Sequence, residues 1–455
     1  MANGAPAQPR SSGLFSGLLL IALGTLLLFW TYAHISLGSV FRHWWPLIFI
    51  VWGIVKFYER TVAQRSGRTT GWITAGEIFL VVGVFCLIGV VIIVDLVRQR
   101  IHEGPWRGIE IGDPYSFDLD IPSQSVPPNA HIQLNIPRGD ISVHAADEAK
   151  LAVTGKKQVR SWNQEAAQKT ADEVKLDLVK EGDTYVLRPG GAAEDDNRFN
   201  FDLDVNVPKK SEVSVKSRKG DIHVADIAAP VLISTQKGDI EVSDTGGSVT
   251  IDTSGGDTTV SDTKGDVKIS GKGGEVTVNN ATGGLTLNGE FYGPIRAEKI
   301  AKGVRFISHR SDFTLTQLTG HMEVGSGNFE VVDATGNLTL RTSQADISLE
   351  NIGGRVTVDN RNGPINVRYS NSPKDDIQLN NSSSEITLSL PGNTSFEVIA
   401  DCHSCDINSE FSSSSLNKTT TKTGDSHLEG KYGSGRSVKI VLRTSYGSIN
   451  IRKTS

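Results

Sequence analysis

The residues of this 455-residue chain with the clearest chemical potential are aspartates that follow glycine at regular intervals. Such a row could bind calcium, as in β-rolls with a nine-residue repeat, but that pattern needs aspartate inside a longer glycine-rich turn, which is missing here. Paired carboxylates could also cleave glycans, but no pair stands apart from the row. We expect turn aspartates that accept hydrogen bonds from nearby backbone N–H groups. They are Asp140, Asp221, Asp239, Asp257 and Asp266.

The sulfur and imidazole groups predict no catalytic centre. Cys402-His-Ser-Cys405 could be redox-active or half of a zinc site, but no second cysteine pair and no surrounding βαβ unit accompany it. We expect either a structural disulfide between Cys402 and Cys405 or two unpaired thiols. The ten histidines are scattered, and the hydrolase, zinc-protease and nucleotide-binding motifs are missing. We therefore predict a protein that is not an enzyme, with no catalytic residue, metal or cofactor.

A glycine repeat positions these residues. Glycine recurs every nine residues from Gly238 to Gly283, and the register returns at Gly336 after several slips. A short strand with alternating apolar residues follows each glycine, which predicts a parallel β-solenoid. Alternating turn types suggest an eighteen-residue coil with two faces, and three sides per coil is the alternative. The apolar pairs expected inside include Val249 and Ile251, Val267 and Ile269, Leu285 and Leu287, and Phe313 and Leu315.

The chain before and around the repeats predicts further parts. Strands are expected at His131–Ile136, Asp183–Leu187 and Phe201–Val207, and a helix at Trp162–Val174. We assign 101–130 to a linker, with Pro114–Pro128 as a stalk, 131–210 to a β-rich cap with one helix, and 211–455 to the solenoid. Outward positions on successive coils could bind a regular surface such as a glycan, although threonine is also a common strand residue. These positions are Thr250, Lys268, Thr286, Thr339 and Thr357.

Three apolar segments within residues 1–100 predict transmembrane helices at about 14–32, 41–58 and 72–95. The middle segment is short, so a re-entrant hairpin is its alternative. The loop after it carries four basic residues against Glu59, and the positive-inside rule places this loop in the cytoplasm. The third span then leads outward, against the weaker indication of Arg98 and Arg100. A net charge of −5 gives no basic surface for nucleic acid. The four basic residues are Lys56, Arg60, Arg65 and Arg68.

Two stretches resemble known bacterial families. Gly17-Leu-Leu-Leu-Ile-Ala-Leu-Gly24 followed by Trp45-Pro-Leu-Ile-Phe-Ile-Val-Trp-Gly53 resembles the LiaI/LiaF-type transmembrane module of envelope-stress proteins. Phe201-Asp-Leu-Asp-Val-Asn-Val-Pro208 and the following Gly-Asp-Ile-x-Val units resemble the β-strand-repeat family called putative adhesin, a domain of unknown function. The second resemblance covers about 130–453 and implies the solenoid fold, but little about activity.

The sequence predicts a multi-pass protein of the bacterial cytoplasmic membrane whose C-terminal β-solenoid is extracytoplasmic. We expect a non-catalytic envelope protein that binds or senses at the cell wall. The LiaI/LiaF resemblance adds a role in envelope-stress signalling, and its partners would be the lipid bilayer, a cell-wall glycan or a signalling protein. The alternatives are a surface adhesin that contacts host or matrix, and a carbohydrate-active β-helix enzyme.

Overall fold

The computed structural model describes residues 112–190 and 198–454, together with eight isolated helical residues nearer the N-terminus. The chain divides into two compact units, Met1–Ile109 and Glu110–Ser455. Most of the predicted spans at 14–32, 41–58 and 72–95 fall outside the described residues. Among the residues that are described, no helix combines the length and apolar character needed to span a membrane. The eight isolated residues are Gly53, Ile54, Phe57, Thr61, Val82, Gly83, Cys86 and Gly89.

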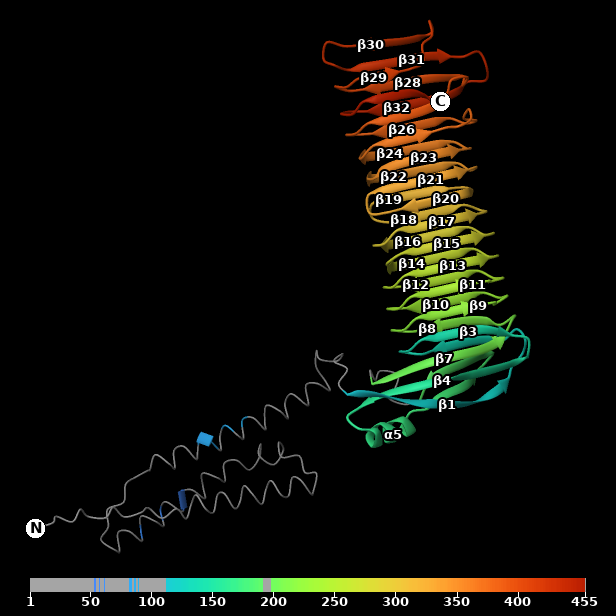
Figure 1. Cartoon of the computed structure of the whole chain (residues 1–455), viewed down its shortest axis with the longest axis vertical. Helices are drawn as coiled ribbons and strands as arrows, with labels where there is room; N and C mark the ends of the chain where they lie inside the picture. The colour runs from blue at the N-terminus through green and yellow to red at the C-terminus, as the bar shows by residue number, and fades with distance from the viewer. Residues whose placement is uncertain are drawn as a thin grey trace, which may run out of the picture. The chain divides into compact units, whose positions relative to one another are not determined.

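The unit Glu110–Ser455 is a stack of β-coils whose strands belong to two sheets (Figure 1). The first sheet has 16 strands. In spatial order they are β1 (Asp113–Ser125), β4 (Lys150–Ser161), β7 (Phe199–Pro208), β3 (Ile141–Ala146), β9 (Ile222–Ala225), β11 (Ile240–Ser243), β13 (Thr258–Thr263), β15 (Val276–Ala281), β17 (Ile295–Ile300), β20 (Leu318–Val324), β21 (Asn328–Ala334), β23 (Asp346–Ile352), β25 (Ile365–Arg368), β27 (Ile386–Pro391), β33 (Ile449–Thr454) and β29 (Ile407–Ser409).

The second sheet lies opposite the first, and the pairings between its strands give their spatial order. In spatial order its strands are β5 (Leu176–Glu181), β6 (Thr184–Pro189), β2 (His131–Asn135), β8 (Glu212–Lys216), β10 (Val231–Thr235), β12 (Val249–Thr253), β14 (Val267–Gly273), β16 (Leu285–Phe291), β18 (Val304–Ile307), β19 (Ser311–Leu315), β22 (Leu338–Gln344), β24 (Val356–Asn362), β26 (Ile377–Asn381), β32 (Val438–Thr444), β28 (Phe396–Cys402), β31 (Ser426–Tyr432) and β30 (Leu416–Thr420).

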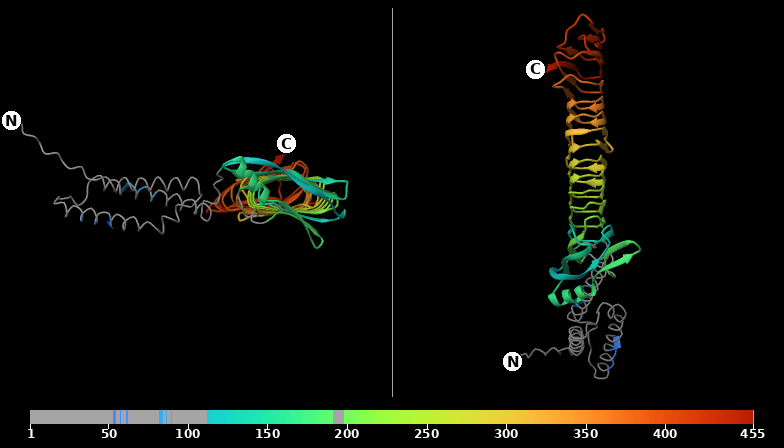
Figure 2. Two further views of the ribbon diagram at one scale, coloured as in Figure 1. Left: turned by 90° about the horizontal axis from the view of Figure 1, so that it is seen from below. Right: turned by 90° about the vertical axis from the view of Figure 1, so that its right-hand side faces the viewer.

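Each regular coil contributes one strand to each sheet, so the predicted two-sided coil is confirmed over the three-sided alternative. In the second sheet Val249 pairs with Val267, eighteen residues later, and Val267 pairs in turn with Leu285. The right-hand view of Figure 2 shows the coils one above another, and the left-hand view looks along the stack. Parallel stacking pairs the backbone of each strand with the coil before and the coil after it.

The apolar rows of the two sheets face each other and form one continuous core. The predicted inward residues are buried: Val249, Ile251, Val267, Ile269, Leu285 and Leu287 are each at most 1 % exposed. The same core cluster extends from Val126 to Ile451. Because it runs through the cap and the coils without a break, the unit Glu110–Ser455 has the core of an independent domain.

One coil in the middle of the stack runs backwards. Strand β19 is antiparallel to both β18 and β22, and β20 is antiparallel to both β17 and β21. Three-residue turns at 308–310 and 325–327 reverse the chain. This corrects the expectation that Phe313 and Leu315 are another parallel copy. Their side chains are buried as predicted, but alternation fixes only which face is apolar and not the direction of the strand.

The two ends of the stack do not follow chain order. At the C-terminal end, β32 and β33 insert between the preceding coils, so that β32 pairs with both β26 and β28 (Figure 1). At the N-terminal end, β2 likewise lies between β6 and β8. Antiparallel strands lie at three of the four sheet ends: β1 and β4 beyond β7, β5 beyond β6, and β31 and β30 beyond β28. The first sheet ends on the other side in the three-residue strand β29, which is parallel to β33. Short or antiparallel end strands hinder end-to-end association of a long solenoid.

The linker interpretation of 101–130 is wrong for Asp113–Ser125, which is strand β1 paired with β4. Phe117, Leu119 and Ile121 alternate with polar residues and pack against the core, which outweighs the Pro/Ser content of the segment. The helix predicted at 162–174 is α5 (Gln164–Glu173). Buried Lys157 of β4 donates hydrogen bonds to the carbonyls of Ala171 and Val174 at the C-terminal end of helix α5.

Candidate functional site

The predicted aspartates form a hydrogen-bonded ladder along one corner of the stack. The Asp221 carboxylate accepts from the backbone N–H of Asp239, the Asp239 carboxylate from that of Asp257, and the Asp257 carboxylate from that of Glu275, each at 2.8 Å. Asp140 precedes them in the same ladder, and Asp266 accepts from Gly284 at another corner. These side chains thus accept from backbone N–H groups as predicted, but the donor lies in the adjacent coil rather than in the same turn.

A second ladder depends on backbone geometry. Asp226, Asp244, Asp262 and Asn280 recur every eighteen residues with φ between 51° and 64°. Aspartate and asparagine tolerate this left-handed conformation better than other residues with a β-carbon. The Asn280 side chain also donates to the Asp262 carboxylate at 2.6 Å. The sequence signal for this ladder is the Ser-Asp-Thr motif at 243–245 and 261–263, which lies in the turns whose alternation predicted the eighteen-residue coil.

The ladder predicts a measurable stability effect without calcium. Asp239→Ala should lower the free energy of unfolding by about 1 kcal/mol, because the exposed N–H of Asp257 loses a charged acceptor. Asp239→Asn keeps an acceptor oxygen and should recover most of this loss. Denaturant melts of the three proteins, with and without calcium, provide the test. A calcium-dependent rise in the melting temperature that Asp239→Ala abolishes would contradict the structural assignment. Among the described residues, no group of three or more His, Cys, Asp or Glu could hold a metal ion.

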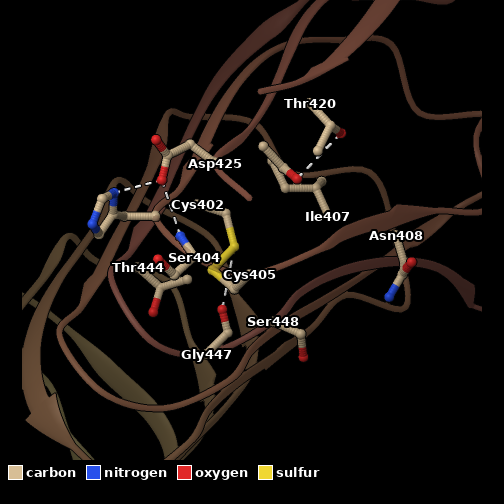
Figure 3. The surroundings of a disulfide bond; sticks show 12 residues. Cys402, Ser404, Cys405, Ile407, Asn408, Thr420, Asp425, Thr444, Gly447 and Ser448 are labelled. Atoms are coloured by element: carbon tan, nitrogen blue, oxygen red, sulfur yellow. Dashed lines mark hydrogen bonds and ion pairs between the residues drawn. A yellow bond between two sulfur atoms is a disulfide. The ribbon is translucent and has the colours of Figure 1, made fainter. Parts of the chain in front are cut away.

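Cys402 and Cys405 are joined by a disulfide in the turn that follows β28 (Figure 3). The Sγ of Cys402 lies 3.3 Å from the carbonyl oxygen of Gly447, so the bridge packs against the segment between β32 and β33. Asp425 holds the same turn from the other side, since its carboxylate accepts from the N–H of Ser404 at 3.1 Å and contacts Nδ1 of His403 at 2.6 Å. The bridge therefore braces a junction of three segments.

A row of polar residues crosses the outer face of the second sheet beside this junction. The strand registers place its members directly opposite one another on six neighbouring strands. Oppositely charged or hydrogen-bonding neighbours in such a row stabilise the sheet. Sequence reasoning missed the row because the strands that build it are not adjacent in the chain. Its members, in order, are Asp359, Asn380, Arg443, Asp401, His427 and Thr419.

The row forms part of the lining of a hollow of about 690 Å³. His403, Thr421 and Asp425 contribute further polar groups. The lining includes three carboxylates, one guanidinium, two imidazoles and several hydroxyls and amides, and apart from Cys402 all of its residues are polar. We call this hollow the C-terminal cleft. It can offer many hydrogen bonds to a ligand but no large aliphatic side chain.

His427 links the hairpin β30–β31 to the floor of the C-terminal cleft. Its Nδ1 lies 2.7 Å from the Asp401 carboxylate and its Nε2 lies 3.4 Å from that of Glu429. The hydrogen bond to Asp401 is the main reason that the pKa of His427 is raised above its ordinary value of 6.5. The charged imidazolium is therefore favoured in the folded protein.

This histidine predicts a pH-dependent contribution to stability. The stabilisation by charged His427 should be complete below about pH 6.5, the ordinary value, and should be lost as the pH rises through the raised pKa. The melting temperatures of the wild type and of His427→Gln should therefore differ most at about pH 5 and converge at alkaline pH. Thermal melts across this range test the prediction. A difference of the same size at every pH would show that the charge of His427 has no part in it.

The predicted outward positions lie on the outer face of the second sheet. Thr250, Lys268 and Thr286 are in register on β12, β14 and β16, and Thr339 and Thr357 are in register on β22 and β24. All five are at least partly exposed. The reversed coil separates the two groups, so the face is not one uninterrupted threonine ladder.

The geometry defines a class of protein: a two-sided, mostly parallel β-solenoid held at its corners by side-chain ladders. The chain belongs to the Toastrack DUF4097 family, which matches residues 129–452. This match supports the adhesin-like repeat family proposed from the repeats, and the LiaI/LiaF-type module stays a prediction. No curated protein matches the chain.

Solved structures from three bacteria also match. A "putative cell adhesion protein" of Clostridium sporogenes is 11 % identical with a TM-score of 0.16, and covers 75 % of this chain and 100 % of its own. A "putative adhesin" of Bacteroides fragilis is 10 % identical with a TM-score of 0.16, and covers 76 % and 99 %. A "putative lipid binding protein" of Parabacteroides distasonis is 12 % identical with a TM-score of 0.21, and covers 76 % and 98 %. At these TM-scores the matches carry no argument about this chain.

Proposed function

We propose that this chain is a non-catalytic protein of the bacterial cell envelope, whose β-solenoid binds a wall-associated polymer outside the cytoplasmic membrane. The observation that carries the proposal is the register of exposed polar residues on successive coils. Adjacent strands lie about 4.8 Å apart, so equivalent side chains repeat at that spacing along the outer face. A periodic polymer can contact several of them at once, and many weak contacts add up through multivalency.

The corner ladders support a scaffold role for the carboxylates. The aspartates that could have acted as a catalytic pair or a calcium site are already occupied by backbone N–H groups of the adjacent coil. The apolar segments of residues 1–100 supply the membrane anchor in this proposal, and their resemblance to the LiaI/LiaF-type module extends it to envelope-stress signalling.

The direct test is retention of the unit Glu110–Ser455 on purified peptidoglycan, on wall glycans and on anionic lipid vesicles, with and without calcium. We expect calcium-independent retention on a wall polymer and an unchanged polymer after incubation. Failure to bind any of the three would contradict wall binding and favour a protein partner. Release of soluble sugar fragments would contradict the non-catalytic assignment.

The proposed topology gives a separate prediction. Reporter fusions at Gly67, within the basic loop, and at Ser455 should show opposite sides of the membrane, with Gly67 in the cytoplasm. Alkaline phosphatase and green fluorescent protein fusions together distinguish the two sides. If both positions report the same side, the segment 72–95 does not cross, and a cytoplasmic Ser455 would contradict the localisation.

A further inference from the structure

We infer that the C-terminal cleft is a binding site for a neutral, hydroxyl-rich saccharide. This inference rests on the proposed function and names the part of the molecule that recognises the polymer. The floor of the cleft is the polar row on the second sheet, and the disulfide-braced turn lies at its side. A site on packed strands holds its polar groups in fixed positions, which favours specific recognition.

The first argument is a side-chain acceptor without a partner. Asn380 lies in the middle of the row, and its Nδ2 donates to the Asp359 carboxylate at 2.6 Å. Its Oδ1 is buried and accepts no hydrogen bond within the described part of the chain. A buried acceptor in this state is costly unless a further donor satisfies it. A ligand that draws the Asn380 amide toward the cleft would supply that bond.

The second argument is the arrangement of donors and acceptors around Asn380. Arg443 pairs with Asn380 on the neighbouring strand, and its Nε lies 3.5 Å from the Asp401 carboxylate. The row therefore presents an acceptor beside a guanidinium donor, followed by another carboxylate. A hydroxyl group both donates and accepts, so one hydroxyl can satisfy both neighbours. A saccharide carries several hydroxyls on a rigid ring and can engage successive positions of the row.

The third argument concerns the classes of ligand that the lining disfavours. Asp359, Asp401 and Asp425 would repel a phosphate or another anion. A cation would have to compete with Arg443 and His427 for Asp401, and the other two carboxylates are already paired with Arg341 and His403. An acyl chain would find no large aliphatic side chain among the lining residues to pack against. A neutral polyhydroxylated ligand meets none of these penalties.

The test is ligand-observed saturation-transfer NMR of the unit Glu110–Ser455 with neutral oligosaccharides of glucose, mannose and N-acetylglucosamine. Methyl phosphate, spermidine and a short-chain phosphatidylcholine are the comparison ligands. We expect signal transfer from at least one oligosaccharide and from none of the comparison ligands. Transfer only from methyl phosphate, spermidine or lipid, or from no ligand at all, would overturn the inference.

Variants locate the site. Asn380→Leu should weaken saccharide binding about tenfold or more, because the ligand loses a hydrogen bond. Its melting temperature should change little, since the unsatisfied oxygen is removed together with the bond to Asp359. Thr419→Val, an exposed change on β30, should also weaken binding. Asn288→Leu is the matched control, because Asn288 is exposed in the same outward row but lies outside the cleft, and its binding should equal that of the parent.

The outcomes separate the two proposals. If the wall polymer retains the domain but Asn380→Leu and Thr419→Val bind as the parent does, the cleft assignment is wrong while the proposed function stands. If neither the polymer nor any oligosaccharide binds, both are wrong.

Discussion

Replacing Val267 by aspartate is expected to lower the free energy of unfolding of the unit Glu110–Ser455 by about 3 to 5 kcal/mol, because a carboxylate would be buried without a partner. Val267 is 1 % exposed and lies in the inward row of the second sheet between Val249 and Leu285. Every neighbour in that row is aliphatic, so the new charge finds no hydrogen-bond donor. Chemical denaturation followed by circular dichroism measures the loss.

Lys268→Asp is the matched control for Val267→Asp. Lys268 is the next residue on β14 but points to the outer face, where it is exposed. The same aspartate side chain there should change the free energy of unfolding by no more than about 0.5 kcal/mol. If Val267→Asp melts as the parent does, or if both variants lose the same amount, the inward assignment of this row is wrong.

The coil geometry was largely predictable because its determinants are local. A glycine every nine residues and a strand with alternating apolar residues fix the turn spacing and the buried face. That information predicted the six inward residues from Val249 to Leu287 and favoured an eighteen-residue, two-sided coil, while three sides per coil stayed open until the strand pairings decided it. The strands and the helix expected before the repeats are also present, as β2, β6, β7 and α5.

The order of the coils was not predictable, because it depends on which of several similar strand edges pair. Alternating strands offer nearly the same apolar row in either direction, so Phe313 and Leu315 read as one more parallel copy. In the same way, nothing local distinguishes β32 from a terminal coil, yet it pairs on both sides. Pairing between strands that are distant in the chain depends on contacts throughout the stack, so the sequence of one repeat does not predict it.

The candidate site also has one part that the sequence predicts and one part that it does not. The aspartates of the corner ladder belong to a local turn motif, so their role as acceptors of backbone N–H groups could be inferred. The C-terminal cleft depends on β24, β26, β32, β28, β31 and β30 lying side by side in that order. Because this order differs from the chain order, the residues of the polar row show no spacing that would reveal them.

Gly256→Ala, a substitution at one corner of the coils, should lower the free energy of unfolding by about 2 to 5 kcal/mol. Gly256 has a φ of +95°, a conformation that alanine adopts only with strain. A β-carbon at this position would also lie 2.0 Å from the carbonyl oxygen of Gly238 in the adjacent coil. The coils would have to separate at this corner, which would weaken the Asp239–Asp257 hydrogen bond beside it.

Gly255→Ala tests whether this effect comes from the stacking and not from the loss of a glycine. Gly255 is the preceding residue of the same turn, it does not have a positive φ, and its added β-carbon would approach Gln236 only to 3.4 Å. Alanine fits there, so the free energy of unfolding should stay within about 1 kcal/mol of the parent. Equilibrium denaturation of the two variants and the parent gives the comparison. Equal losses for Gly255→Ala and Gly256→Ala would mean that close approach between successive coils does not explain why glycine recurs at these corners.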